Sequence, residues 1–549
     1  MSIEQQQAMD ALYAIDNVLT VRISMPSAEW EAVRTEQPKG GRCNFDFTGG
    51  ARYTWRKATS VQIAGTAFPA APVTFHNVGI KKKSFCGSIS TEKPCLHLDF
   101  GKFADSDDAE AALGSRYLTL NNSIQDSSFI RQTLGYRILG AAGLPHSRCN
   151  YARVLVNGTL IGQGLPGVDG PGIYVSTEPV MKRYIERNFN GNMKGNLYEI
   201  EHHDDLVDER LDFIGVESLS EFDDKADVKF AVHHIAANGL AGAVQMVDID
   251  QFIKFYAMEF FLKHWDSYSE NTNNTYLFNN VVAVEQPGVD DVRFVMIPWG
   301  IDQILRPEKP FRLGREGVVA KLVREDPAKR AQLFEQVRVY RQMLFDREVQ
   351  QTTWGPLIDQ LQALVAGFGV PNADSRINEV RRQLRLAGSA GYLIGGVPSD
   401  TAVYIVDDAG RCLHASNTES VPAGVPVPTQ FEVYHLPLRD DNDKSDLWRV
   451  DALGSGRSLT NLAYSRALHA SDSVTSAGHQ QLSTCPADNT AQADEFTFVK
   501  ADSPGDFTFS GHAELVSSRT GLAATFGSDL TPGGRPRVHQ GDGSRVHLY

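Results

Sequence analysis

WDSYSENTNNTYLF at residues 265–278 and RFVMIPWGIDQ at residues 293–303 each place one aspartate at the end of an apolar run. Asp266 follows residues 255–265, whose apolar positions recur every three or four residues, as in a buried helix. Asp302 follows a short apolar run of strand type. A carboxylate at the end of a buried element is costly unless something binds it, and divalent cations prefer oxygen ligands. The pair therefore predicts a metal or proton-transfer site. A helix-capping aspartate and a turn aspartate are the alternative.

Composition narrows the class of protein. The chain has 549 residues, of which 42% are hydrophobic and 22% charged, which is typical of a globular protein with about two or three domains. Acidic residues outnumber basic ones by 67 to 53, and the longest Lys/Arg run is Lys81–Lys83. This balance argues against a nucleic-acid-binding protein. The chain also lacks an apolar stretch long enough for a membrane-spanning helix.

The first residues and the cysteines leave the compartment open. Residues 1–7 lack the basic start and apolar run of a secretory signal, so either the protein stays inside the cell or the chain begins after a removed leader. None of the six cysteines has metal-site spacing, and they are either free thiols or form up to three disulfides. They are Cys43, Cys86, Cys95, Cys149, Cys412 and Cys485.

The N-terminal part is predicted to be rich in strands. Residues 17–24 alternate as a strand and lead into a helix capped at Ser27. Short strands follow from residue 40 to residue 100, and the last of them covers residues 93–100. Lys93 stands at the start of this strand, where a single cation would meet a phosphate. An ordinary surface lysine is the alternative.

The next segments alternate between strands and helices. Residues 117–122 form a strand that ends in two amides, and residues 126–139 form an amphipathic helix with Asp126 as its N-cap. An Asn-Gly pair predicts a hairpin over residues 152–161. Residues 162–167 match G-x-G-x-x-G, but no helix pattern follows, so a loop is the better interpretation.

The C-terminal third is predicted to be a separate all-β domain. Helical patterning over residues 317–390 ends in a Gly-rich stretch at residues 387–398, which indicates a domain boundary. Beyond it, residues 411–417 (RCLHASN) recur as residues 466–472 (RALHASD), with a weaker third copy at residues 520–525. Three turn-rich β repeats resemble a β-trefoil.

Part of this domain also resembles ricin-type lectins. The resemblance rests on Leu447-Trp448 and on Ser458–Asn461. The usual Q-x-W signature is absent, so a glycan-binding trefoil and a trefoil used as a rigid spacer are equal alternatives.

Seven short motifs follow one another in the chain: Leu118–Asn122, Asp126–Ser128, Gly143–Pro145, Val156–Gly158, Gly195–Tyr198, Trp265-Asp266 and Ile297–Trp299. With these motifs the chain resembles the spore-coat protein H (CotH) kinase family, and the match runs in order over roughly residues 15–390. The resemblance implies an atypical two-lobed protein kinase that uses ATP with Mg²⁺ or Mn²⁺ and phosphorylates Ser or Thr of a protein substrate. It also favours a cell-surface or spore-surface location.

The resemblance assigns roles to individual residues. In ordinary kinases a metal-binding Asn follows the catalytic Asp by five residues, and a second Asp downstream binds the metal. By this analogy Asp266 is the catalytic base and Asp302 the principal metal ligand. Asn271 has the kinase spacing, whereas Asn273 and Asn274 lie nearer to where the family's amide falls. Asn271 and Asn274 are together the candidate metal ligands.

The same resemblance assigns Lys93 to the ATP phosphates. Glu178 or Asp126 is expected to orient Lys93, and the sequence does not separate the two. One departure from the family concerns Gly300, because many members read Trp-Asp-x-Asp where this chain reads Trp-Gly-Ile-Asp at residues 299–302.

The predicted organisation is α+β: an atypical two-lobed protein-kinase-like domain followed by an all-β trefoil. The kinase-like domain covers residues 1–390, with a β-rich part over about 1–175 and a mainly helical part over about 176–390. The trefoil covers residues 398–549. The predicted function is metal- and ATP-dependent protein phosphorylation. The alternatives are a non-catalytic surface, coat or adhesion protein with a degenerate kinase fold, and transfer of another nucleotide-derived group such as AMP.

Overall fold

A computed structural model describes residues 2–548, apart from 49, 163–171, 218–219, 223, 310, 371, 396–400, 408, 420–429, 438–443, 454–455, 476, 487–494 and 501–512. The G-x-G-x-x-G stretch and the end of the predicted domain boundary lie largely outside these residues. The chain divides into two compact units. The first comprises 1–309, 314–333 and 351–381, and the second comprises 310–313, 334–350 and 382–549.

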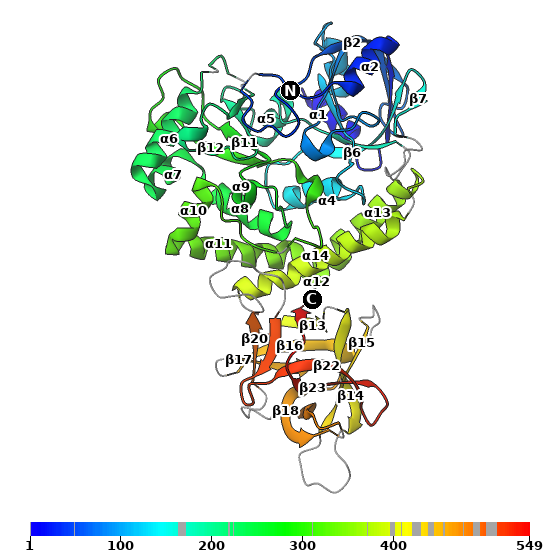
Figure 1. Cartoon of the computed structure of the whole chain (residues 1–549), viewed down its shortest axis with the longest axis vertical. Helices are drawn as coiled ribbons and strands as arrows, with labels where there is room; N and C mark the ends of the chain where they lie inside the picture. The colour runs from blue at the N-terminus through cyan, green and yellow to red at the C-terminus, as the bar shows by residue number, and fades with distance from the viewer. Residues whose placement is uncertain are drawn as a thin grey trace. The chain divides into compact units, whose positions relative to one another are not determined.

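The first unit begins with a closed β-barrel (Figure 1). Among the described residues its strands follow the order β1-β2-β3-β4-β5-β8-β6-β7, and β1 also pairs in parallel with β6, which closes the barrel. Val21, Ile23, Leu96, Leu98 and Leu120 are fully buried inside it. The strands are β1 Leu19–Ser24, β2 Arg56–Gly65, β3 Val73–Lys82, β4 Leu96–Asp99, β5 Tyr117–Asn121, β6 Cys149–Val156, β7 Thr159–Leu160 and β8 Ile173–Thr177.

Of the local structures predicted for this part of the chain, the hairpin is confirmed and the two helix N-caps are not. The Asn-Gly hairpin is confirmed, because Asn157 and Gly158 both have positive φ (50° and 84°) between β6 and β7, as a type I′ turn requires. The capping predictions were wrong. Helix α2 (Ser27–Thr35) has Pro26 as its N-cap, and α4 (Arg131–Ala141) begins five residues after Asp126.

A second sheet, which is antiparallel, is formed by residues that follow the barrel in the chain. Its strands run in the order β10-β9-β11-β12 and are β9 Leu197–Ile200, β10 Gly215–Val216, β11 Thr275–Asn279 and β12 Phe294–Pro298. Thr275 lies opposite Pro298 in the β11–β12 ladder. The loop before β11 therefore meets the loop after β12 at one end of the sheet. The loop before β11 contains Asp266, and the loop after β12 contains Asp302.

Helix α8 (Ile249–Phe261) packs against strand β12 of this second sheet (Figure 1). This helix is buried over most of its length, as its apolar pattern predicts, and Asp248 caps its N-terminus by accepting from the Gln251 amide. The other helices are α1 Ile3–Leu12, α3 Asp107–Leu113, α5 Lys182–Asn188, α6 Ala226–Asn238, α7 Leu240–Met246, α9 Tyr268–Asn271, α10 Val318–Glu325, α11 Pro327–Tyr340, α12 Arg347–Val349, α13 Gly355–Ala366 and α14 Ala373–Gly395.

The second unit contains a β-trefoil. Six strands close a barrel through the pairings β13–β16, β16–β17, β17–β20, β20–β21, β21–β24 and β24–β13. Three hairpins, β14–β15, β18–β19 and β22–β23, pair with one another beside it. The strands are β13 Thr401–Asp407, β14 Arg411–Glu419, β15 Phe431–Pro437, β16 Leu447–Leu453, β17 Gly456–Asn461, β18 Arg466–Val474, β19 Gln480–Pro486, β20 Phe496–Lys500, β21 Ala513–Ser517, β22 Ala523–Leu530, β23 Pro536–Gly541 and β24 Val546–Leu548.

The repeats seen in the sequence occupy equivalent places in the trefoil. The two strong copies form β14 and β18, and the weak third copy leads into β22. Each of these strands carries a register shift at the same place in its hairpin, at 415–419, 470–474 and 526–530. The prediction of a β-trefoil is therefore confirmed by the strand pairing itself.

Candidate active site

Asp266 lies in the turn after α8, where three asparagine side chains hold its carboxylate. Asn271 Nδ2 and Asn273 Nδ2 donate to Oδ1 at 2.7 and 3.1 Å, and Asn274 Nδ2 donates to Oδ2 at 2.9 Å. Asn274 also donates to the Asp266 carbonyl oxygen at 2.8 Å. The amide cluster in the sequence therefore serves to orient this carboxylate. Both predicted amides, Asn271 and Asn274, reach it through nitrogen.

Asp302 lies on a short 3₁₀ turn, η4 (Ile301–Gln303), directly after β12. Helix α4 packs closely on this turn, because a Cβ at Gly135 would stand 2.8 Å from Ile301 Cδ1. Desolvation and, to a smaller extent, the charges of Asp126 and Asp266 raise the pKa of Asp302 to about 7, although a hydrogen bond with Asn121 acts in the opposite direction. The structure therefore brings the two predicted aspartates within electrostatic reach of each other.

Asp126 is the third carboxylate near Asp266 and Asp302. It is not the helix N-cap that the sequence predicts. Its side chain is buried and accepts from Ser128 Oγ at 2.5 Å, from the Arg131 amide at 2.9 Å and from Arg131 Nη1 at 2.5 Å. The single Arg131 charge is thus committed to Asp126. Asp302 and Asp266 have no comparable cation bound to them among the described residues.

Lys93 is fully buried, which its position at the start of a strand did not predict. Its Nζ lies 5.5 Å from the centre of the Phe129 ring and 5.3 Å from that of Tyr174, and it has no hydrogen-bond partner among the residues that the structure describes. Burial lowers the pKa of Lys93 to about 8. Gly162 packs on its alkyl chain, since a Cβ there would stand 3.0 Å from Lys93 Cδ.

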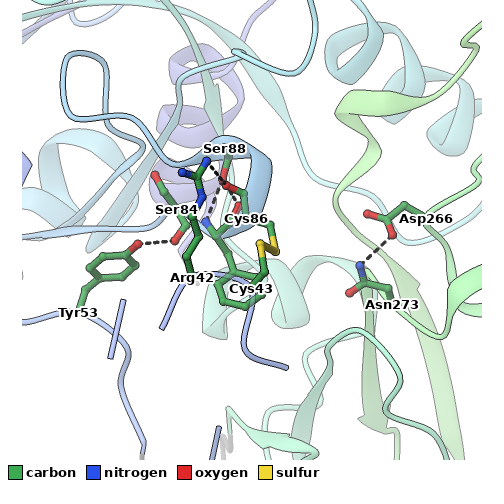
Figure 2. The surroundings of a disulfide bond; sticks show 9 residues. Arg42, Cys43, Tyr53, Ser84, Cys86, Ser88, Asp266 and Asn273 are labelled. Atoms are coloured by element: carbon green, nitrogen blue, oxygen red, sulfur yellow. Dashed lines mark hydrogen bonds between the residues drawn. A yellow bond between two sulfur atoms is a disulfide. The ribbon is translucent and has the colours of Figure 1, made fainter. Parts of the chain in front are cut away.

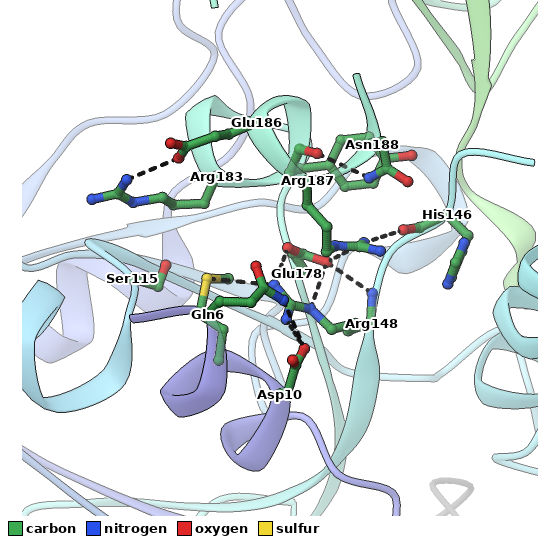
Figure 3. Close-up of polar contacts among 12 residues, drawn as sticks. Gln6, Asp10, Ser115, His146, Arg148, Glu178, Arg183, Glu186, Arg187 and Asn188 are labelled. Carbon is green, nitrogen blue, oxygen red and sulfur yellow. Dashed lines mark hydrogen bonds and ion pairs between the residues drawn. The ribbon is translucent and has the colours of Figure 1, made fainter. Parts of the chain in front are cut away.

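Glu178 does not orient Lys93. It is buried, and its carboxylate binds two arginines, Arg148 Nη2 at 2.8 Å and Arg187 Nη2 at 2.7 Å. Figure 3 shows this group with Asp10 of α1, which pairs with the same Arg148. The ion pairs lower the pKa of Glu178 despite its burial. The arrangement ties α1, β6 and α5 together, so we assign Glu178 a structural part and drop it as a partner of Lys93.

Gly300 has a steric reason to be glycine. Its φ is +58°, and a Cβ there would stand 2.0 Å from Asn274 Oδ1. The backbone of the same segment is bound as well, because the Trp299 amide donates to the Asn274 carbonyl at 3.0 Å. The residue that departs from the family pattern therefore leaves room for the amide that holds Asp266.

Three residues near the site were not predicted. Asn121 hydrogen-bonds Asp302, and Asn273 is the third amide on Asp266. His264 is buried, and desolvation lowers its pKa to about 4, so its ring is neutral beside Asp266. The amide pair at the end of β5 was the available signal for Asn121. No pattern in the sequence distinguished His264 from an ordinary core histidine.

A disulfide closes the loop on the barrel side of this region. Cys43 and Cys86 are bonded, and Arg42 Nη2 donates to the Cys86 carbonyl at 3.3 Å. Figure 2 shows the disulfide together with Asp266 and Asn273. Phe45 of the same loop stacks on His202 with ring centres 4.2 Å apart. The other four cysteines are buried thiols.

Comparison with protein families agrees with this geometry. Residues 84–352 match the model of the family described as CotH kinase protein. This segment is a CotH kinase domain. The matched range contains Lys93, Asp266 and Asp302. No curated protein matches the chain.

Solved structures that match the chain align with about a quarter of it. One is a Caenorhabditis elegans protein of unknown function, at 18% identity over 28% of this chain and 95% of that one, with a TM-score of 0.23. The designed threefold-symmetric protein ThreeFoil has 17% identity over 27% and 96%, with a TM-score of 0.20. A lectin from Polyporus squamosus has 12% identity over 28% and 50%, with a TM-score of 0.21.

The residues of the CotH domain fit both groups that the family implies. Asp302 and Asp266 are carboxylates near each other without a bound cation among the described residues, and the raised pKa of Asp302 expresses the unfavourable charge at this place. A divalent cation would relieve it. Lys93 has the opposite need, because it is a buried cation without a hydrogen-bonded anion among the described residues. The oxygens of a phosphate would accept its hydrogen bonds and balance its charge.

None of the described helices is both long and apolar enough to cross a membrane.

Proposed function

We propose that the protein is an atypical protein kinase that transfers the γ-phosphoryl group of ATP to Ser or Thr of a protein substrate. The observation that carries this proposal is the buried Lys93 ammonium, which has no hydrogen-bond partner among the described residues, in the same domain as the Asp266 and Asp302 carboxylates. A protein gains no stability from such an arrangement alone. An ATP–metal complex brings the missing anion and the missing cation together.

Asp302 would be the principal ligand of Mg²⁺ or Mn²⁺, with the side-chain oxygen of Asn271 or Asn274 as a further ligand. When bound, the cation neutralises negative charge on the phosphates. Lys93 would donate from Nζ to the phosphate oxygens, and its surroundings favour this role because burial strengthens a charge-assisted hydrogen bond. The two-lobed arrangement of kinases is part of this proposal.

Asp266 would accept the proton of the substrate hydroxyl as that oxygen bonds to the γ-phosphorus. The bond between the γ-phosphorus and the bridging oxygen breaks, and ADP leaves. The amides of Asn271, Asn273 and Asn274 fix the carboxylate in one orientation, and such positioning supplies much of the catalysis in phosphoryl transfer.

Incubation with labelled ATP and Mg²⁺ or Mn²⁺ tests the proposal. We expect labelling of the protein itself or of an added protein at Ser or Thr, and loss of labelling in Asp266→Asn and in Asp302→Asn. Asp208→Asn is the matched control, because Asp208 is an exposed carboxylate paired with His233. Labelling that persists in both site variants, or that is absent from the wild type with every substrate tried, would overturn the proposal.

A non-catalytic surface, coat or adhesion protein is the second candidate. Gly300 favours it, because it replaces a carboxylate that many family members carry, and the C-terminal β-trefoil favours it as a module suited to adhesion. A thermal-shift assay with ATP·Mn²⁺ and a glycan array separate the two. Glycan binding without a nucleotide-induced shift would support adhesion.

A further inference from the structure

Two histidines and one aspartate meet on the hairpin side of the trefoil. Asp529 lies in the bulge of β22, His539 on the neighbouring β23, and His479 directly before β19, which also pairs with β23. Asp529 Oδ1 is 4.0 Å from His479 Nδ1 and 4.0 Å from His539 Nε2. We propose that these three residues bind a zinc ion, independently of the kinase site.

The spacing of the donor atoms suits one ion. Zinc takes imidazole nitrogen and carboxylate oxygen at roughly 2.0–2.2 Å, so two donors 4.0 Å apart are each within reach of a common centre. The two imidazole rings stack with centres 4.0 Å apart and nearly parallel planes, at 10°. Both rings thus present an edge to the same carboxylate oxygen.

The donor atoms are available for a ligand. Asp529 Oδ1 is buried and accepts no hydrogen bond from a described residue, while the other oxygen, Oδ2, lies 3.3 Å from Arg537 Nε. His539 Nδ1 lies 3.1 Å from the Gln540 carbonyl oxygen. A proton on Nδ1 completes that hydrogen bond and leaves the Nε2 lone pair facing Asp529. Histidines that bind metals are usually held in this way by their second nitrogen.

A glycine keeps the space beside these donors open. A Cβ at Gly527 would stand 2.8 Å from Asp529 Oδ1 and 2.8 Å from His539 Nε2. Hence a methyl group at this position would occupy the place of the ion without removing a ligand. This bulge has counterparts in the other two hairpins of the trefoil, but His479, Asp529 and His539 are contributed by unrelated positions of the repeats.

The ligand set selects the class of ion. Two imidazoles with one carboxylate are typical of Zn²⁺, whereas Mg²⁺ and Ca²⁺ prefer oxygen alone. His479 is 46% exposed, so the fourth coordination position faces solvent and is open to water or to an external donor. Zinc bound here would tie the bulge of β22 to β19 and β23.

The test uses the full chain after dialysis against a chelator, with an excess of Mg²⁺ to saturate oxygen-only sites. Bound Zn²⁺ is counted by elemental analysis, and Co²⁺ reports tetrahedral nitrogen and oxygen ligation by its visible absorption. We expect Asp529→Asn and His539→Ala to bind one equivalent of Zn²⁺ fewer than the wild type. His233→Ala is the matched control, since His233 pairs with Asp208 at 3.1 Å without a third ligand, and it should keep the wild-type number.

Gly527→Ala provides the decisive second variant. It keeps all three ligands, so a loss of at least roughly tenfold in Zn²⁺ affinity with unchanged circular dichroism supports the site. Equal Zn²⁺ uptake by the wild type, Asp529→Asn and His539→Ala would overturn the proposal. If a ligand variant fails to fold, unchanged affinity in Gly527→Ala overturns it instead.

Discussion

Replacement of Lys93 by methionine should make the protein more stable while it removes nucleotide binding. Burial in the folded chain lowers the pKa of Lys93 from its ordinary 10.5 to about 8. This lowering corresponds to about 3 kcal/mol against the charged form in the folded state. Methionine has a similar length, carries no charge and suits the space between the Phe129 and Tyr174 rings.

The sign of the effect follows from proton binding. Between pH 8 and pH 10.5 the unfolded chain holds a proton on Lys93 that the folded chain has released, so stability rises with pH across this window. Below pH 8 both states are charged and the full penalty is present. We therefore expect Lys93→Met to raise the free energy of unfolding by up to about 3 kcal/mol at pH 7, with the gain disappearing toward pH 10.5.

Lys82 provides the control. It is also fully buried, but its Nζ donates to the Arg34 carbonyl at 2.9 Å and to the Glu36 carbonyl at 3.2 Å. Lys82→Met leaves two carbonyls without their donor and should lower the free energy of unfolding by about 1–3 kcal/mol. The folded Lys82→Met protein should still bind ATP·Mg²⁺ as the wild type does.

Urea denaturation of the first unit, with and without ATP·Mg²⁺, measures both effects. The expected pattern is a higher midpoint for Lys93→Met without nucleotide and no further rise when nucleotide is added. A Lys93→Met protein that is less stable than wild type would contradict the account of an uncompensated cation. Undiminished stabilisation by ATP·Mg²⁺ would contradict its phosphate role.

Three further substitutions test the surroundings of the two aspartates. Gly300→Ala should cost about 3 kcal/mol in urea denaturation, because it adds strain at positive φ and displaces the Asn274 amide from a carboxylate. Glu259 of α8 is buried and accepts a hydrogen bond from Ser269 of α9, the helix that follows Asp266. Burial raises the pKa of Glu259 to about 8, so the folded state holds a proton that the unfolded state releases above pH 4.5, and about 3 kcal/mol of stability is lost by pH 7. Glu259→Gln should remove this fall in stability between pH 4.5 and pH 8. Asp302→Asn should raise the thermal midpoint without metal and abolish the shift that Mn²⁺ produces, whereas a shift of wild-type size would contradict its role as metal ligand.

Patterns of short range were readable from the sequence. The Asn-Gly hairpin needs only two residues in the left-handed region, and the trefoil needs only three similar hairpins, so both follow from local repetition. Asp266 and Asn271 are only five residues apart, and Asn271 Nδ2 lies 2.7 Å from Asp266 Oδ1. These features depend on neighbours in sequence.

Features of long range were not readable. The sequence around Glu178 does not reveal whether its carboxylate binds Lys93 or an arginine. Its actual partner, Arg148, is brought to it by the pairing of β8 with β6. Burial of Lys93 likewise depends on Phe129 and Tyr174, which belong to other segments. The proposed zinc ligands are Asp529 of β22, His539 of β23 and His479 directly before β19, which the trefoil brings together, and their spacing in the sequence resembles no metal motif.

Gly300 and Asn274 form one sterically coupled unit, and this changes how the departure from the family pattern is interpreted. An aspartate at 300 would require a Cβ 2.0 Å from Asn274 Oδ1, so the carboxylate of other family members and this conformation of Asn274 exclude each other. In this chain the space is filled by the Asn274 amide, which donates to both the carbonyl oxygen and the carboxylate of Asp266. A decayed site would be expected to lose such contacts, because nothing would select against their loss. The chain instead replaces a second carboxylate with tighter positioning of the first, which reduces the negative charge around Asp302. Under the proposed function, Asp302 would then be left to bind the metal and Asp266 to accept the proton.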